Sequence, residues 1–449
     1  MPLRLRLRRA PAVAALAVGA VAALALSGCS AGSPDASGPV TIQFWHAMSG
    51  PAATELDALV SQYDAHNDDG VTVESSYQGT YADVQTKYTA AVQSGSTPDL
   101  LMMNDISTGF MVDSGQTVPI ATLAAGDPSF DASALAPAAT SYYGGPDGLQ
   151  AMPFSISMPV LYLDRALVAR AGLDVSAPPR TLDEVATWAR AIHDATGAYG
   201  MTMNMSDSWM LEQLSASGGQ DFCSPDNGRG GAPVDGVSLT TPTQVAFMTE
   251  LQGLFRDGVA LNPGTDNSTM TSAFTSGGVG MMMTSSGAYT TADPQGTASV
   301  VARFPTTSGS SDAGAVIGGN ALWVSGEGHS DAQQEAAYRF ARWLASTDVQ
   351  AEWSAATGYL AVDTAAPTTE AGRASLADPN VATMYQQLAD DPASTAAAGC
   401  VTGAFPSVRS TVISAFDQVV EGADVTSTMS TAEDTAAGQI ASYEAAAGR

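Results

Sequence analysis

The chain has 449 residues, with 45 Asp and Glu against 17 Lys and Arg, and a formal net charge of −28 at pH 7. Such a surface repels nucleic acid, and the sequence holds no basic stripe along which a phosphate backbone could lie. A chain of this length exceeds what one hydrophobic core usually serves, so we expect two lobes.

The N-terminus predicts export from the cell. An apolar run over residues 10–26, rich in Ala, Val and Leu, follows a basic head that contains Arg4, Arg6, Arg8 and Arg9. A positive head, a short apolar run and small residues at its end are typical of a secretory signal. The run is somewhat shorter than the roughly 20 apolar residues of a spanning helix.

The tetrapeptide Leu26-Ser27-Gly28-Cys29 resembles the bacterial lipobox. This resemblance implies a lipoprotein signal peptide over 1–28, acylation of Cys29, and a flexible leash over 29–38. Several acyl chains on one residue anchor a protein firmly. We therefore expect an extracytoplasmic protein that is lipid-anchored to the outer face of the cell membrane. The alternative is an ordinary signal cleaved nearby, beside a chance cysteine.

Cysteine and histidine usage argues against a metal site. Besides Cys29 the chain has only Cys223 and Cys400. An even pair in an exported protein predicts a possible disulfide, with two buried free thiols as the alternative. The four histidines show neither HxH nor HExxH spacing. We therefore predict no metal and no other cofactor.

Strands and helices alternate in the first part of the chain. Alternating or apolar segments predict strands at 41–45, 71–77 and 98–103, and apolar residues at helical spacing predict helices at 55–66 and 81–94. Strands separated by helices of about ten to fifteen residues are typical of a mostly parallel sheet that is covered on both faces.

The same alternation continues towards the C-terminus. Thr181, followed three residues later by Glu184, predicts a capping box at the start of a helix. Short apolar runs predict strands at 158–164, 278–283 and 321–324. The other expected helices span 181–194, 243–257, 335–344, 349–356, 383–389, 407–421 and 431–447. Two α/β lobes, export and a tether suit a protein that traps a small solute between hinged lobes.

The segment Phe44-Trp45-His46-Ala47-Met48 resembles the FWHxM opening of the glycerol-3-phosphate-binding subunits of ABC importers, within family 1 of the extracellular solute-binding proteins. Further blocks follow in the family's order and spacing and cover essentially the whole chain after the signal. Each block alone is weak evidence, whereas eight in register are strong. The other blocks are Tyr77-Gln78-Gly79-Thr80-Tyr81, Pro153-Phe154 to Pro159-Val160-Leu161-Tyr162, Ala171-Gly172-Leu173-Asp174, Thr284-Ser285-Ser286-Gly287, Ile317-Gly318-Gly319-Asn320-Ala321-Leu322-Trp323-Val324, Thr357-Gly358-Tyr359-Leu360 and Phe405-Pro406-Ser407-Val408-Arg409.

This resemblance implies an α/β fold, namely a two-lobe flytrap of the periplasmic-binding-protein type, with hinge crossings and mostly parallel sheets flanked by helices. Lobe 1 would comprise 39–149 and 306–345, and lobe 2 would comprise 150–305 and 346–449. The family also implies a monomer that binds a small phosphate-containing molecule and delivers it to two permease subunits and an ATPase subunit. Neither enzyme activity nor a nucleic-acid partner is expected.

The resemblance also indicates ligand positions. By motif these fall on Tyr81, Asp105, Ser157, Ser285, Gly319, Tyr359 and Arg409. The guanidinium of Arg409 would give a phosphate fork-shaped, charge-assisted bonds; the alternative is a surface arginine. Asp105 would accept hydrogen bonds from two glycerol hydroxyls, at the end of a strand where open α/β sheets bind ligands. Alternatively, Asp105 caps the helix that follows it.

The remaining ligand positions would supply neutral groups. Ser157, Ser285 and the backbone N–H of Gly319 would donate to the phosphate. Tyr81 and Tyr359 would cover the glycerol backbone with their rings, although the pattern alone places Tyr359 in the core.

One departure from the family's pattern bears on the ligand. Members that take glycerol 3-phosphate carry two tryptophans three apart before a Leu-Glu pair, which is here Leu211-Glu212. Those positions hold Met205 and Ser208, with Trp209 displaced by one. The lost indoles would leave room for a larger head group. A trimethylammonium needs an aromatic face, for which Tyr81, Trp209 and Tyr359 are the candidates. We therefore expect glycerophosphodiesters, glycerophosphocholine first, over glycerol 3-phosphate.

Three other classes stay open. A sugar or oligosaccharide receptor would have several stacking aromatics and no essential arginine. A second class is a secreted phosphodiesterase or glycosidase. Cleavage of a phosphodiester usually needs metals or a histidine pair, which this sequence lacks. The 45 carboxylates are too many to exclude an Asp/Glu pair by counting, but no spacing suggests one. An adhesin or structural lipoprotein would not require two hinged lobes.

Overall fold

The computed structural model describes residues 39–448 apart from 69, 146, 204–208, 265–266, 308–313 and 392–393. The leader with Cys29 lies outside the described residues, and so do Met205 and Ser208. Among the helices of the described part, none combines the length and the apolar character that crossing a membrane takes.

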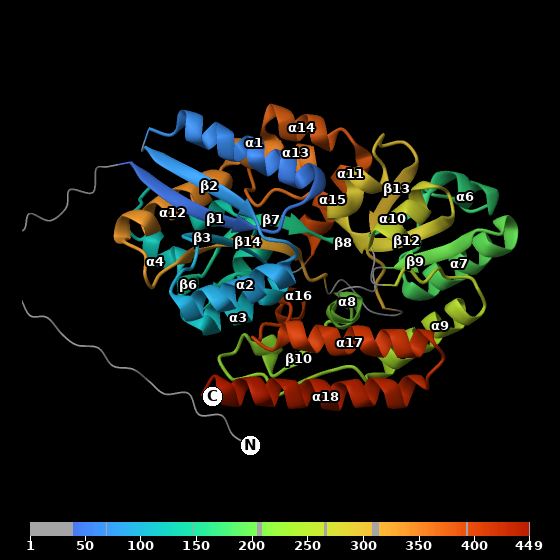
Figure 1. The fold of residues 1–449 in the computed structure, drawn as a ribbon. Coiled ribbons are helices and arrows are strands. Elements are labelled where there is room, and N and C mark those ends of the chain that lie inside the picture. The colour runs from blue at the N-terminus through green and yellow to red at the C-terminus, as the bar shows by residue number, and fades with distance from the viewer. Residues whose placement is uncertain are drawn as a thin grey trace, which may run out of the picture. The chain divides into compact units, whose positions relative to one another are not determined.

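Six strands form the larger sheet, which lies among the blue and teal elements of Figure 1. They are β1 Val40–His46, β2 Val71–Tyr77, β3 Leu100–Asn104, β4 Thr117–Val118, β7 Met152–Ser157 and β14 Gly318–Ser325. The order is β2-β1-β3-β14-β4, and β7 also pairs with β14. Strand β1 is parallel to β2 and β3, whereas β14 is antiparallel to β3, β4 and β7.

Four strands form the second sheet. They are β8 Pro159–Asp164, β9 Tyr199–Met203, β12 Val279–Ser285 and β13 Ser299–Arg303, in the order β13-β8-β12-β9. Strand β12 is parallel to β9, and β8 is antiparallel to both β12 and β13. Two short hairpins complete the strands: β5 Gly144–Gly145 with β6 Gly148–Leu149, and β10 Cys223–Ser224 with β11 Gly236–Val237.

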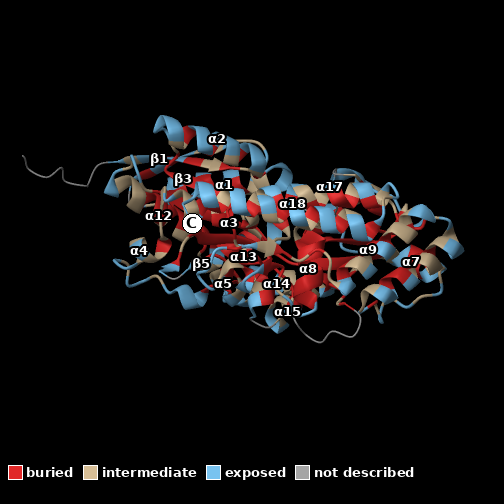
Figure 2. Cartoon of the chain, turned by 90° about the horizontal axis from the view of Figure 1, so that it is seen from below, coloured by how far each residue is buried: buried red, intermediate tan, exposed pale blue. Residues whose placement is uncertain are grey.

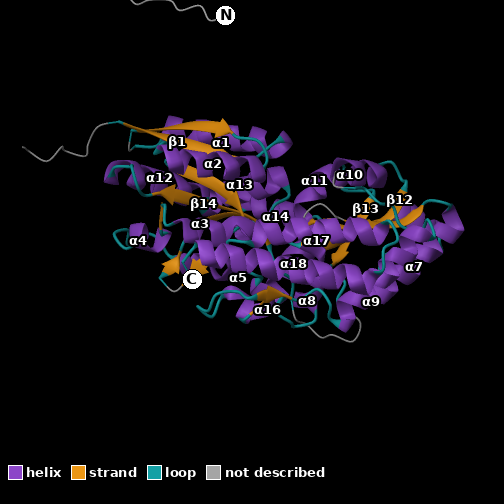
Figure 3. Cartoon of the chain, turned by 60° about the horizontal axis from the view of Figure 1, so that its bottom comes forward, coloured by secondary structure: helices purple, strands orange, loops and turns teal. Residues whose placement is uncertain are grey.

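Helices cover the sheets, and their buried faces turn towards the strands (Figure 2). Helices α17 and α18 pack side by side along their length (Figure 3). The helices are α1 Gly50–His66, α2 Tyr81–Ser94, α3 Thr108–Ser114, α4 Ile120–Ala124, α5 Pro137–Tyr142, α6 Arg165–Arg170, α7 Leu182–Thr196, α8 Trp209–Ser217, α9 Pro242–Arg256, α10 Asn267–Thr275, α11 Tyr289–Ala292, α12 Asp331–Leu344, α13 Thr347–Thr357, α14 Glu370–Leu376, α15 Pro379–Asp390, α16 Thr395–Ala398, α17 Phe405–Val420 and α18 Val425–Ala446.

Local chemistry fixes several helix ends where the sequence predicts them. At α7 the Thr181 side chain accepts from the Glu184 backbone N–H, and the Glu184 side chain accepts from the Thr181 N–H, so the predicted capping box is confirmed. Thr80 and Asp83 form the same motif at α2. Both helices end at a glycine in the left-handed conformation, Gly95 for α2 and Gly197 for α7, as is common for helices.

The expected two-sheet α/β architecture is confirmed, but the sheets are mixed rather than mostly parallel. The chain crosses from β7 to β8 through the single residue Met158. Strand β8 begins where its neighbour β12 ends, and β14 begins where its neighbour β3 ends. Each of the two strands therefore runs antiparallel to that neighbour.

The sheets also assign two segments differently from the expected lobe division. Strand β7 was expected in lobe 2, yet it pairs with β14 of the larger sheet. Helix α13 was also expected in lobe 2, yet it packs on α1. The chain therefore leaves the larger sheet after Ser157, not at residue 150.

Candidate functional site

Four strand ends bring predicted ligand residues to one edge. Asp105 follows the last residue of β3, and the ladder pairs Asn104 with Asn320 near the start of β14. A second ladder, between β14 and β7, pairs Gly318 with Ser157, the last residue of β7. Across the crossing, the end of β12 pairs with the start of β8. The two sheets therefore meet where their polar strand ends lie.

Two glycines make room at this edge. Gly319 has φ of +131°, a conformation that favours glycine, and a Cβ there would collide with the carbonyl of Ser155. A Cβ on Gly318 would lie 2.8 Å from Ser157 Oγ and 3.3 Å from Cζ2 of the Trp209 ring. The predicted residues Ser157, Trp209 and Gly319 are thus brought together around Gly318.

Ser285 lies beside the predicted aromatic residue Tyr359. Its hydroxyl accepts from the Gly287 backbone N–H at 3.1 Å. A Cβ on Gly287 would lie 3.2 Å from the Tyr359 ring, so the missing side chain lets the ring approach. Tyr359 stacks on the buried Trp353 with ring centroids 6.0 Å apart and is itself half-buried. The structure therefore places Tyr359 at the edge of the core rather than inside it.

Buried polar groups that the sequence did not predict lie at the same edge. Asn320 is fully buried, and its side chain lies within hydrogen-bonding reach of the Tyr81 hydroxyl. The hydroxyls of Tyr142 and Tyr143 are buried without a partner within the described part of the chain. Such groups normally have partners, so they mark a place prepared for a polar ligand. The signal in the sequence was a lone Asn directly before the apolar run predicted as a strand at 321–324.

Electrostatic effects on the tyrosines show which groups are neighbours. Burial raises the pKa of Tyr81 well above its ordinary value, Tyr359 and Asp105 raise it further, and the nearby Asn320 side chain lowers it. Burial raises the pKa of Tyr359 as well, and Asp105 adds to that shift. Tyr81 and Tyr359 are therefore neutral hydroxyls around the Asp105 carboxylate at physiological pH.

Arg409 is buried and paired, so its alternative interpretation as a surface arginine is wrong. Its side chain is 6% exposed and donates from Nη2 to Glu212 Oε2 at 2.7 Å. Asp105 Oδ2 lies 4.0 Å from the same nitrogen, and the guanidinium carbon lies 4.9 Å from the Phe405 ring centroid. Asp105 is the first residue of a short 3-10 helix whose N-cap is Asn104, so it is not a helix cap.

A second arginine, Arg229, which was not among the predicted ligand residues, lies near Tyr142, as Arg409 does. Arg229 Nε donates to the Gly399 carbonyl at 2.8 Å and Nη1 donates to the Ser141 carbonyl at 2.9 Å. Its guanidinium carbon lies 5.0 Å from the centroid of the Tyr142 ring. Arg229 therefore joins the end of α5 to the segment after α16.

That segment is also held by a disulfide. Cys223 and Cys400 are bonded, with their Cα atoms 5.6 Å apart. The Cys400 backbone N–H donates to Glu212 Oε1 at 2.9 Å. Two groups donate to the Glu212 carboxylate, Arg409 Nη2 and the Cys400 N–H, and the disulfide fixes the position of the second.

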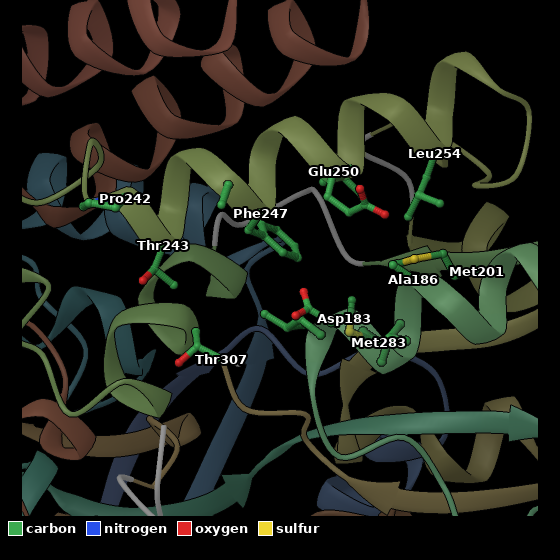
Figure 4. A pocket seen from close by; sticks show the side chains of 14 residues that line it. Asp183, Ala186, Met201, Pro242, Thr243, Phe247, Glu250, Leu254, Met283 and Thr307 are labelled. Carbon is green, nitrogen blue, oxygen red and sulfur yellow. The ribbon is translucent and has the colours of Figure 1, made fainter. Parts of the chain in front are cut away.

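A cavity of about 360 Å³ lies elsewhere, between α7 and α9 (Figure 4). Met201 of β9 and Met283 of β12 contribute to its lining, while Asp183 and Glu250 supply acidic groups. Of the predicted ligand residues that the structure describes, none lines it. In addition, no cluster of three or more His, Cys, Asp or Glu suited to a metal occurs in the described ranges.

Comparison with known proteins gives consistent relatives. Residues 58–383 match the family described as bacterial extracellular solute-binding protein. The sn-glycerol-3-phosphate-binding periplasmic protein UgpB of Escherichia coli is 30% identical over 395 residues, 85% of this chain and 88% of that protein. UgpB of Rhizobium meliloti is 29% identical over 329 residues, 72% of this chain and 76% of its own.

Solved structures show the same fold. The cyclic alpha-maltosyl-1,6-maltose binding protein of Arthrobacter globiformis has a TM-score of 0.72 at 26% identity, covering 90% of this chain and 99% of that one. UgpB of Mycobacterium tuberculosis in complex with glycerophosphocholine has a TM-score of 0.76 at 20% identity, again covering 90% of this chain and 99% of its own. The two-lobe α/β architecture of these proteins is shared by this chain.

Proposed function

The chain belongs to the bacterial extracellular solute-binding protein family, and we propose that it captures glycerophosphodiesters, glycerophosphocholine first, between its two lobes. The observation that carries this proposal is the convergence of one buried guanidinium and one carboxylate, Arg409 and Asp105, 4.0 Å apart. A glycerol phosphate presents the matching pair: an anion for the arginine and vicinal hydroxyls for the acid.

The other groups at the edge suit the rest of such a ligand. The Ser157 and Ser285 hydroxyls and the Gly319 N–H are neutral donors for phosphate oxygens. The buried Asn320 amide offers both a donor and an acceptor. Trp209, which lies beside Ser157, would give a trimethylammonium the aromatic face it needs. Met205 and Ser208, in place of two indoles, would leave room for that head group.

The relatives support this proposal. The Escherichia coli relative carries sn-glycerol 3-phosphate in its name, and the Mycobacterium tuberculosis neighbour was solved with glycerophosphocholine. We further propose that Cys29 is acylated and anchors the protein to the outer face of the membrane. From there it would deliver its ligand, as a monomer without catalytic activity, to two permease subunits and an ATPase subunit. Labelling of cells with a radioactive fatty acid tests the anchor: Cys29→Ala should abolish incorporation, and unchanged incorporation would refute it.

Titration calorimetry on the chain lacking residues 1–28 tests the ligand. We expect saturable binding of glycerophosphocholine, with weaker binding of glycerol 3-phosphate. Tight binding of glycerol 3-phosphate with none of the diester would refute the order of preference. Release of choline during the titration would refute the absence of catalysis.

A carbohydrate receptor is the second candidate, favoured by the maltosyl-maltose binding neighbour at 26% identity. A sugar has no anion for Arg409. If loss of the Arg409 side chain leaves the affinity for the true ligand intact, the ligand is a sugar and not a phosphodiester.

A further inference from the structure

Tyr142 and Tyr143 carry two phenol hydroxyls into the interior of the protein. Tyr142 is 1% exposed and Tyr143 is fully buried, and neither hydroxyl has a hydrogen-bond partner among the residues that the structure describes. A phenylalanine would fill the same space without a hydroxyl to desolvate, and an unsatisfied buried hydroxyl lowers the stability of a fold. The two hydroxyls therefore reduce stability unless a group outside the described chain bonds to them.

The contacts of the two residues hold their side chains in place. The rings meet edge to face, with centroids 5.2 Å apart. Arg229 covers the Tyr142 ring, with its guanidinium carbon 5.0 Å from the centroid, and the same side chain donates to the Ser141 carbonyl at 2.9 Å. The Tyr143 carbonyl accepts from the Gln150 N–H at 2.9 Å. Hydroxyls that are held in this way are oriented before a ligand arrives, which reduces the entropy lost on binding.

The hydroxyl end of the Tyr142 ring lies on the arginine side of the site. A Cβ on Gly399 would lie 3.3 Å from Tyr142 Cε2, the ring carbon next to the one that carries the hydroxyl, and 3.0 Å from Glu212 Oε1. The other oxygen of Glu212 accepts from Arg409 Nη2 at 2.7 Å. Tyr142 therefore presents its hydroxyl beside the ion pair that borders the position proposed for the phosphate.

Tyr143 lies towards the carboxylate that the proposed function assigns to the glycerol. The groups that act electrostatically on its hydroxyl are the Asp105 carboxylate and the hydroxyls of Tyr142 and Tyr81. Asp105 and Tyr81 are the residues expected around the glycerol, and the ring contact with Tyr142 sets Tyr143 next to the phosphate position. The two hydroxyls thus lie along the direction in which a glycerol phosphate would extend from Arg409.

We propose that the Tyr142 and Tyr143 hydroxyls are ligand contacts, with Tyr142 donating to a phosphate oxygen beside Arg409 and Tyr143 bonding a glycerol hydroxyl beside Asp105. This inference rests on the proposed function, because it takes the ligand to be a glycerophosphodiester that binds at these two charges. It adds two residues that the family's pattern did not indicate. Both phenols are neutral at physiological pH, so each donates one hydrogen bond and can accept another.

Calorimetry on phenylalanine variants tests the inference, because this exchange removes only the hydroxyl. Glycerophosphocholine and methylphosphocholine, a diester with the same head group and no glycerol, are titrated into the wild-type, Tyr142→Phe and Tyr143→Phe proteins. Weak binding of methylphosphocholine is measured by displacement of glycerophosphocholine. Tyr142→Phe should raise both dissociation constants by at least about tenfold, as the loss of a bond to a charged oxygen does. Tyr143→Phe should raise that of glycerophosphocholine by about threefold to tenfold and leave that of methylphosphocholine within about twofold of the wild-type value.

Thermal melts of the unliganded proteins separate ligand contact from support of the fold. Neither Tyr142→Phe nor Tyr143→Phe should have a lower Tm than the wild type, because each loses a hydroxyl without a partner in the described part of the chain. Tyr338 provides the matched control, since it is 1% exposed and its hydroxyl donates to Asp127 Oδ2 at 3.0 Å. Tyr338→Phe should lower the Tm and leave both dissociation constants within about twofold of the wild-type values.

The outcomes distinguish this inference from the proposed function. If glycerophosphocholine binds the wild type and either tyrosine variant leaves its dissociation constant unchanged, that hydroxyl does not contact the ligand and the inference is overturned. A lower Tm together with weaker binding in either variant overturns it as well, because the hydroxyl then supports the fold. Equal weakening of both ligands by Tyr143→Phe refutes the assignment of Tyr143 to the glycerol. If neither ligand binds the wild-type protein, the proposed function fails first and the inference with it.

Discussion

Loss of the Arg409 side chain should affect stability and binding in ways that can be separated. Arg409 is 5% exposed and Glu212 is 1% exposed, and they form an ion pair at 2.7 Å. Replacement of Arg409 by Met keeps most of the apolar volume but leaves a buried carboxylate without its ion-pair partner. Breaking a buried pair in this way costs about 3–5 kcal/mol of folding free energy.

The double variant Arg409→Met/Glu212→Gln should recover most of that loss. A neutral Gln at 212 keeps an acceptor for the Cys400 N–H and no longer needs a cation. Replacement of a buried ion pair by neutral groups is often close to neutral in stability, so we expect the double variant within about 1–2 kcal/mol of the wild type. Both variants should still lose the phosphate ligand, because neither has a guanidinium.

Guanidinium denaturation followed by circular dichroism measures the stability, and calorimetry measures the binding. A double-mutant cycle then gives the coupling between the two residues, expected at about 2–3 kcal/mol in stability. Two results would refute the reasoning. An Arg409→Met protein as stable as the wild type would mean that the pair is not formed in solution, and a double variant that binds glycerophosphocholine normally would mean that Arg409 does not hold the phosphate.

Three further predictions concern other parts of the molecule. Tyr443 of α18 donates to Asp113 Oδ2 of α3 at 3.0 Å, so Tyr443→Phe should lower the folding free energy by about 0.5–1.5 kcal/mol, the value of one hydrogen bond; an unchanged denaturation midpoint would show that this bond does not form in solution. Burial raises the pKa of Asp391 from 3.8 to about 6, so the folded state binds the extra proton and stability falls as the pH rises from about 4 to 6. Asp391→Asn should therefore increase the folding free energy at pH 7.5 by up to about 3 kcal/mol, which a thermal melt would detect as a higher Tm. The Tm should stay unchanged at pH 3.5, and a rise at both pH values would contradict this explanation. Because Cys223 and Cys400 close a loop with a sequence separation of 177 residues, replacing both with Ala should cost about 2–5 kcal/mol in denaturation experiments, and an unchanged midpoint would show that the bond does not form in solution.

Much of the local structure follows from the sequence. The strand predicted at 71–77 is β2, and the capping box at Thr181 starts α7 as expected. These predictions succeed because periodicity and capping depend on residues a few positions apart. Strand β7 was missed, because Met152–Ser157 owes its conformation to pairing with β14, more than 150 residues later in the chain.

The candidate site was predicted only in part for the same reason. The family's pattern indicates single positions, and the structure brings Asp105 and Arg409 together. The family's pattern does not indicate which groups surround these two residues. Glu212 is 197 residues from Arg409, and no spacing in the sequence predicts that they form an ion pair. The available signal was a glutamate that stands alone among uncharged residues at 209–217, since such a charge is rarely buried without a partner.

The most direct test of the central claim is a crystal structure of the protein with glycerophosphocholine. The account predicts phosphate oxygens within hydrogen-bond distance of Arg409, with the glycerol hydroxyls at Asp105 and the quaternary ammonium over an aromatic ring. A ligand bound instead in the cavity between α7 and α9, or a phosphate out of reach of Arg409, would contradict it.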